Sequence, residues 1–173
     1  DIKIGLENVL ETIRDMNERR RTMWSASNPK NYNDFRAFIM GIEGNDEIFG
    51  DGVIYEGCSE EPRKYRGQTG AQDDIIPSLD IFTGIINYYP DNMLTKYLMD
   101  LRQYRPKCVQ EYFKDLGEES PKYLNKLTKN EKILLLAIVE QIYFFRNGHH
   151  QFILKYIMKN TKYAKATGGT PII

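Results

Sequence analysis

The stretch from Thr128 to about Lys159 constrains the fold most, because it predicts a single long helix. Thr128 and Glu131 have the spacing of a capping box, which marks a helix start. The helix would be about 45 Å long at about 1.5 Å per residue. Helical steps from His149 reach a stripe of apolar residues: Ile138, Ile142, Phe145, Phe152, Ile153 and Tyr156. We therefore expect an imidazole set into an apolar wall.

Helical periodicity returns in most of the remaining chain, so the sequence predicts an all-α fold. The expected helices cover residues 1–24, 34–42, 74–86, 91–104 and 106–116, and Ser120-Pro121 should start a further short one. Residues 25–33 should break the pattern. The exception is residues 44–74, which are rich in glycine and lack a helical period. We expect one long ordered loop there, with Val53 to Tyr55 as a short extended piece.

Composition limits the class of protein. The 173 residues suit one domain or a large piece of one. Lys and Arg number 24, as do Asp and Glu, and this zero net charge argues against a nucleic-acid or membrane-surface partner. Two cysteines in no metal or disulfide pattern favour a reduced, cytoplasmic setting. No apolar run approaches the roughly 20 residues that span a bilayer.

His149 is the first candidate for a functional side chain, although His150 follows it directly. A lone helical histidine is most often a surface or satisfied core residue. A zinc centre needs more ligands than this pattern offers, whereas one histidine is enough for haem, because the porphyrin supplies the other nitrogens. Arg146, one turn earlier, suits a propionate or a buried carboxylate, and otherwise it is a solvated helix charge.

Two further charges lie among apolar neighbours. If Asp80 is buried, it needs a cationic or imidazole partner, and otherwise it is an exposed helix acid. Arg36 stands between Phe35 and Phe38. Its guanidinium suits bidentate binding of a carboxylate, and the alternative is a side chain that extends along the surface to water.

Two glycine-containing loops complete the candidates. The first runs from Arg66 to Asp74, where small residues let the backbone approach a ligand. The simpler interpretation is a turn in which Asp73 or Asp74 caps the next helix. The second runs from Thr167 to Thr170 and is either a hinge or a loop that closes over a ligand.

Taken together, these segments resemble the indoleamine 2,3-dioxygenase family of haem enzymes. The matching residues occur in one order along the chain: Asn28 to Lys30, Arg36, Gly41, Gly44 and Asn45, Asp51 to Gly57, Tyr65 to Gln72, Ile75 to Asp80, Phe145 to His149, and Ala166 to Pro171. The sequences of the two loops are most similar to those of fungal-type members. Each motif by itself is weak, but their common order and spacing over nearly the whole chain are strong evidence.

The resemblance implies part of the large, C-terminal helical catalytic domain around haem b, with the N-terminal domain absent. It implies insertion of both atoms of O2 across the indole C2–C3 bond of L-tryptophan to give N-formylkynurenine. This reaction opens the kynurenine route of tryptophan catabolism towards NAD. A monomeric cytoplasmic oxidoreductase is expected, with haem iron as its metal, L-tryptophan and O2 as its partners, and neither nucleic acid nor membrane.

The resemblance also implies residue roles. His149 would be the proximal iron ligand, with Asp80 and Arg146 as the charged pair that supports haem binding. Arg36 would hold the substrate carboxylate. The remaining substrate-binding residues would be Tyr32, which packs on the indole, Gln68, Thr69 and Gly70 on the distal side, and Gly169 and Thr170, which close over the substrate. Among them Arg36, Thr69, Gly70 and Thr170 would be catalytic.

Two departures from the family pattern leave alternatives open. Asn31 stands where members usually have a second aromatic, and Asp73-Asp74 replaces a pair that is usually small and hydroxylic. A haem- or indole-binding member without catalysis is therefore one alternative, and a dioxygenase for another indole is a second. A helical interaction module without a cofactor is the third.

Overall fold

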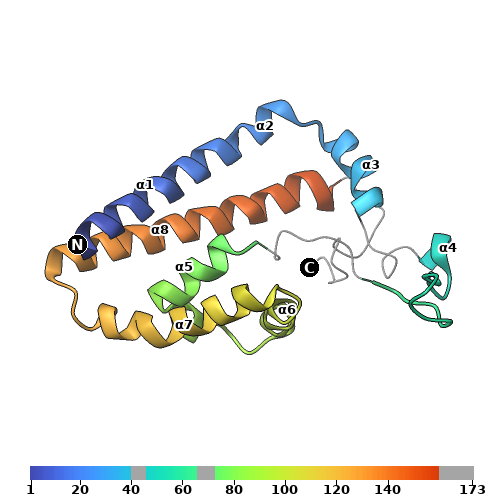
Figure 1. Ribbon diagram of the computed structural model, residues 1–173. Coiled ribbons are helices and arrows are strands. Elements are labelled where there is room, and N and C mark those ends of the chain that lie inside the picture. The colour runs from blue at the N-terminus through green and yellow to red at the C-terminus, as the bar shows by residue number, and fades with distance from the viewer. Residues whose placement is uncertain (40–45, 66–72, 160–173) are drawn as a thin grey trace. The chain divides into compact units, whose positions relative to one another are not determined.

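In the computed structural model, all secondary-structure elements of the described residues are helices (Figure 1). The structure describes residues 1–39, 46–65 and 73–159. Its elements are α1 (Ile2–Arg21), α2 (Met23–Ala26), α3 (Pro29–Ile39), α4 (Asp46–Phe49), α5 (Ile75–Thr83), the 3-10 helix η3 (Ile85–Tyr88), α6 (Met93–Arg102), α7 (Lys107–Leu124), α8 (Lys129–Phe152) and the π-helix η4 (Ile153–Met158). The all-α prediction is confirmed, and none of these helices is long and apolar enough to cross a membrane.

The chain divides into two compact units. Unit 1 contains residues 1–26 and 73–151, and unit 2 contains residues 27–72 and 152–173. The boundary falls near the end of α8, so that Phe152 and η4 belong to unit 2. The sequence predicts that this chain is part of a larger catalytic domain, and this stays a prediction.

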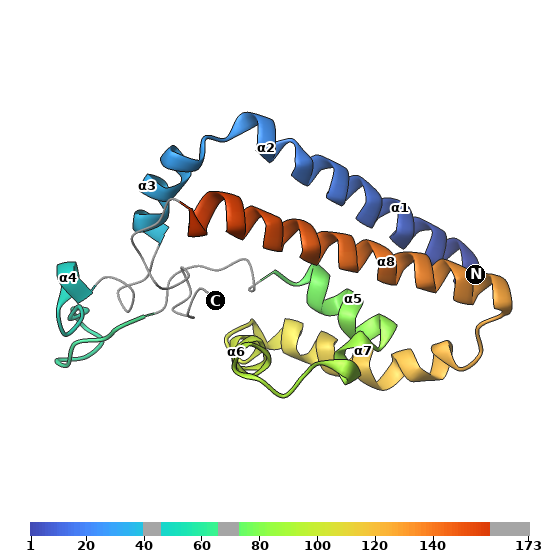
Figure 2. The ribbon, with the colours of Figure 1, turned by 180° about the vertical axis from the view of Figure 1, so that it is seen from behind.

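The core of unit 1 lies between α1 and α8, which run side by side in the same direction (Figures 1 and 2). Both helices contribute one apolar stripe to it, as helical periodicity requires. Ile138 and Ile142 on α8 are almost completely buried. The other buried members of this cluster are Leu6, Leu10 and Ile13 on α1 and Leu127 before α8. The first half of the predicted stripe on α8 is therefore confirmed.

Two predicted helix starts are also confirmed. Before α8, the Thr128 amide donates to Glu131 Oε2 at 2.8 Å, and the Glu131 amide donates to Thr128 Oγ1 at 3.4 Å. The bond from the Thr128 backbone lowers the pKa of Glu131. Before α5, the Asp73 carboxylate accepts from the amides of Ile75 at 2.9 Å and Ile76 at 3.1 Å. Both arrangements satisfy amides that have no partner inside the helix.

The apolar face predicted to run to residue 86 is interrupted at Gly84. This residue has a φ of 77°, in the left-handed region that suits glycine, and it ends α5. The chain continues as η3, and α5 packs against α7. The expected loop at 44–74 contains the short helix α4, and Val53 forms an isolated antiparallel bridge with Arg63, in keeping with a short extended piece.

Two predicted boundaries are wrong. Ser120-Pro121 starts no new helix, because α7 is continuous from Lys107 to Leu124. Ser120 is buried, and its hydroxyl donates backwards to the Leu116 carbonyl at 2.6 Å instead of capping. The break expected at 25–33 is shorter, because α3 already begins at Pro29, where Asn28 Oδ1 accepts from the Lys30 amide at 2.9 Å.

We predict that Ile138→Ala lowers the free energy of unfolding by about 2–5 kcal/mol, because it leaves a cavity in the closed core between α1 and α8. Leu136→Ala is the matched control on the same helix, since Leu136 is 67% exposed, and it should change stability by no more than about 0.5 kcal/mol. Urea unfolding of both variants checks this. Equal losses would contradict the placement of the core.

Candidate functional site

His149 lies in the last turn of α8 and is exposed. The prediction of an imidazole set into an apolar wall is therefore wrong for the described residues. Partial burial of the ring lowers the pKa of His149, and the charges of Arg20 and His150 lower this pKa further. Two positive neighbours and partial desolvation favour the neutral imidazole, which is the form that binds a metal.

Arg20 reaches the same end of α8 from α1. Its guanidinium donates to the backbone carbonyls of Phe145 and, at 3.2 Å, of Phe144. The guanidinium carbon also lies 4.5 Å from the centre of the Phe145 ring. A side chain at position 148 would collide with this guanidinium, so that Gly148 keeps the approach open. These contacts attach the end of α1 to the turn that carries His149.

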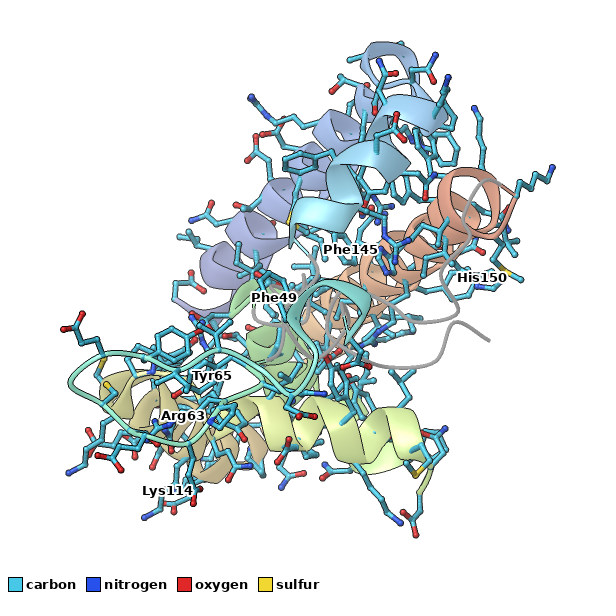
Figure 3. All side chains as sticks on the ribbon, turned by 90° about the vertical axis from the view of Figure 1, so that its right-hand side faces the viewer. Phe49, Arg63, Tyr65, Lys114, Phe145 and His150 are labelled. Carbon is cyan, nitrogen blue, oxygen red and sulfur yellow. The ribbon has the colours of Figure 1, made fainter. Side chains whose placement is uncertain are left out.

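His150 is exposed as well, but it points elsewhere. In Figure 3 it projects from the side of α8 away from α1, whereas Phe145 lies towards α1. A step of one residue turns a helix by about 100°, which separates the two neighbouring imidazoles. His149 is therefore the histidine that shares the surroundings of Arg20.

Asp80 is the most deeply buried acid near this end of α8, with 2% of its surface exposed. Its Oδ2 accepts from Arg146 Nη2 at 2.5 Å and from the Tyr89 hydroxyl. Arg146 Nη2 also donates to the Tyr89 oxygen. The predicted need of a buried Asp80 for a cationic partner is thus met by Arg146, from one turn before His149. Asp80 comes from α5 and Arg146 from α8, both labelled in Figure 1, and Tyr89 directly follows η3.

Burial and charge shape this cluster of Asp80, Tyr89 and Arg146. Burial, together with the hydrogen bond to Asp80 and its charge, raises the pKa of Tyr89 to about 12, so its hydroxyl stays protonated. Burial opposes the charge of Arg146, but the bond to Asp80 and its charge raise the pKa of that guanidinium overall. The second carboxylate oxygen, Asp80 Oδ1, is buried and has no hydrogen-bond partner among the described residues.

Tyr32 belongs to an aromatic cluster in unit 2. Its ring meets those of Phe152 and Tyr156 edge-on, with centroids 5.1 Å and 5.8 Å away. Phe152 and Tyr156 stack on each other at 4.2 Å, and the fully buried Tyr156 donates its hydroxyl to the Ser27 carbonyl at 2.9 Å. The ring of Tyr32 is therefore held from two sides by η4 and the end of α8.

Arg36 follows Tyr32 by one turn of α3 and is 1% exposed. The alternative in which it extends along the surface to water is therefore excluded. Burial raises the pKa of Tyr32, and the positive charge of Arg36 opposes this rise, which places the two groups within electrostatic reach. Asn31, on the same helix, is exposed.

The predicted site residues of the two loops, Gln68, Thr69, Gly70, Gly169 and Thr170, lie outside the described residues. Among the others, the structure brings together Asp80 and Arg146 in unit 1 and Tyr32 and Arg36 in unit 2. The roles of all these residues stay predictions.

Comparison with known proteins decides the family. The family model described as indoleamine 2,3-dioxygenase matches residues 1–171. The chain belongs to the indoleamine 2,3-dioxygenase family. This confirms the resemblance that the motifs indicated, and it covers both units of the fold.

Individual relatives are distant. Indoleamine 2,3-dioxygenase 1 of Rattus norvegicus is 28% identical over 137 residues, which cover 78% of this chain and 33% of that protein. Indoleamine 2,3-dioxygenase 2 of Homo sapiens is 29% identical over 143 residues, covering 81% and 34%. A protein named myoglobin from Haliotis madaka is 26% identical over 171 residues, covering 94% and 42%. The chain spans about a third of the length of the first two relatives.

Sequence reasoning missed two residues at these sites, Arg20 and Tyr89. Arg20 did not stand out because it belongs to the run Arg19 to Arg21 at the end of a helix, where basic residues are common. Tyr89 belonged to no motif, whereas Phe152 was predicted on the apolar stripe but not beside Tyr32. One signal could have indicated Tyr89: the carboxylate of a buried Asp80 is expected to accept hydrogen bonds from more than one donor.

We predict that Arg20→Gln raises the pKa of His149 towards its usual 6.5, because it removes a positive neighbour and loosens the contact that buries the ring. NMR titration of the imidazole protons measures this, with the two rings assigned through His150→Gln. Arg21→Gln is the control, since Arg21 is exposed and lies outside the groups that act on His149. An unchanged pKa in Arg20→Gln would show that the contact is irrelevant to the ring.

Proposed function

We propose that this chain forms the proximal part of a haem-dependent dioxygenase, which inserts O2 across the indole C2–C3 bond of L-tryptophan to give N-formylkynurenine. The observation that carries the proposal is the buried Asp80–Arg146 pair one turn before His149, in a chain of the indoleamine 2,3-dioxygenase family. Membership of the family supports the proposed reaction. The Asp80–Arg146 pair gives a physical reason for the position of His149.

The residues of unit 1 fit a haem group. His149 is exposed, and it offers an imidazole whose lowered pKa favours the neutral form at pH 7. The hydrogen bonds that Arg146 makes with the described residues run through Nη2, and 39% of its side chain is exposed, so its other N–H groups are suited to a haem carboxylate. His149 would hold the haem iron, and the bound group would supply the O2-binding chemistry.

The residues of unit 2 fit the substrate. A guanidinium that is removed from water, as in Arg36, binds a carboxylate more strongly than an exposed one and orients it by its planar fork. The edge-on contacts of Tyr32 fix the plane of an aromatic ring against which an indole packs. These two groups orient L-tryptophan, and orientation is a large part of catalysis when the cofactor carries the chemistry.

Asn31 favours a second candidate, a haem- and indole-binding member without turnover. This side chain is exposed and adds no ring beside Tyr32. The ring of Phe152, however, lies against Tyr32 from another element, so an aromatic wall exists without residue 31. This contact supports the dioxygenase over the inactive member.

We predict that His149→Ala abolishes haem binding, because it removes the imidazole that we propose as the iron ligand. His150→Ala is the matched control and should retain most of the haem, since its ring points away from the surroundings of His149. The intensity of the Soret band per protein measures haem content in both variants. Loss of haem in His150→Ala with retention in His149→Ala would reassign the ligand.

Turnover separates the candidates. We predict that the ferrous, haem-loaded protein with O2 and L-tryptophan develops the absorbance of N-formylkynurenine. A stable haem complex without this product would support the inactive member. A faster reaction with a different indole in the same assay would support a dioxygenase for that indole, and a colourless protein after addition of haem would reject the proposal.

A further inference from the structure

Tyr89 is the third member of the cluster around Asp80. Its hydroxyl donates to Asp80 Oδ2 and accepts from Arg146 Nη2, the same two atoms that form the ion pair. The guanidinium carbon of Arg146 also lies 5.4 Å from the centre of the Tyr89 ring. The phenol therefore contacts Arg146 both through its oxygen and through its ring face.

These contacts constrain Arg146 more than an ion pair does. A single bond from Nη2 to a carboxylate oxygen leaves the guanidinium plane free to turn about that bond. A second acceptor on the same nitrogen, together with a ring beside the plane, removes most of this freedom. The remaining N–H groups are then held in one direction, on a side chain that is 39% exposed.

We propose that Tyr89 is a positioning residue, which holds the outer edge of the Arg146 guanidinium ready for a haem carboxylate one turn before His149. This inference rests on the proposed function, since it needs haem as the ligand. Tyr89 has no part in the chemistry and acts only through Arg146.

The charge of the surroundings agrees with an anionic ligand. Burial lowers the pKa of Arg102, and electrostatic interactions with Tyr89 and Asp80 oppose this effect, so Arg102 lies within electrostatic reach of both. Its guanidinium carbon is 5.7 Å from the centre of the Phe113 ring. The Asp80 carboxylate thus has one guanidinium bound to it, that of Arg146, and a second within electrostatic reach, and the protonated phenol adds no negative charge to these three groups. An added carboxylate would neutralise the excess.

Two probes with the same ring system test the proposal: haem, and haem dimethyl ester, which lacks the free carboxylates. In Tyr89→Phe the ring remains and only the hydroxyl is lost. We predict that this variant releases haem about tenfold faster than the unchanged protein, the effect of one charged hydrogen bond. Release of the dimethyl ester should not change. Transfer to an excess of apomyoglobin, followed by absorbance, gives both rates.

Tyr88→Phe is the matched control, because Tyr88 is the neighbouring residue and is 87% exposed. It should alter neither rate. Equal acceleration of both probes by Tyr89→Phe would show a general role in the fold and would overturn the inference, as would no acceleration at all. An unchanged protein that binds neither probe would reject haem as the ligand, and this inference with it.

A second variant keeps the test independent of any loss of stability. Arg146→Lys removes the planar fork that Tyr89 is proposed to hold. In that background, adding Tyr89→Phe should not accelerate haem release further. Accelerations that multiply in the double variant would show that Tyr89 acts by a route other than Arg146, and would overturn the inference.

Discussion

The burial of one carboxylate, Asp80, is the constraint on which the arrangement of unit 1 depends. An ionised group that is removed from water is strongly destabilising unless charged and hydrogen-bonding partners surround it. The partners come from two other places in the chain: Tyr89 directly follows η3, and Arg146 lies in the last part of α8. Satisfying one charge therefore fixes α5, the end of η3 and the turn before His149 with respect to one another.

The second constraint is the attachment of α1 to the backbone of α8. Asn17 Nδ2 donates to the Gln141 carbonyl at 3.0 Å, and the guanidinium of Arg20 donates to the carbonyls of Phe144 and Phe145. These bonds go to backbone atoms, so they fix the axis of α8 and not merely its side chains. After Phe152, where α8 ends, the chain continues as the π-helix η4, a feature that often occurs at functional sites.

Local signals predicted much of the fold, and their failures have physical reasons. The capping box at Thr128 and the cap at Asp73 depend on neighbouring residues only, so the sequence was sufficient. Asn28-Pro29 and Ser120-Pro121 have the same local signature, yet only the first starts a helix. At Ser120 the side chain is buried and bonds to the preceding turn, which depends on what packs around it.

The exposure of His149 has a similar cause. Periodicity shows which residues share a stripe, but it does not show how far the covering helix extends. α1 covers Ile138 and Ile142 with apolar side chains, but its last turn near His149 carries Arg20 and ends at Arg21. At His149 the stripe is therefore no longer covered by apolar side chains of α1, and the polar side chain of Arg20 lies there instead.

Tyr89 shows what a helical pattern cannot predict. Had the helix of Asp80 continued without a break, residue 89 would lie about 13 Å further along its axis. The left-handed backbone of Gly84 ends α5, and the short 3-10 helix then brings the phenol back to the carboxylate nine residues earlier. A side chain at position 84 would strain this turn. The contact between Tyr89 and Asp80 is thus a property of a broken helix, and the glycine that breaks it belongs to the site as much as the phenol does.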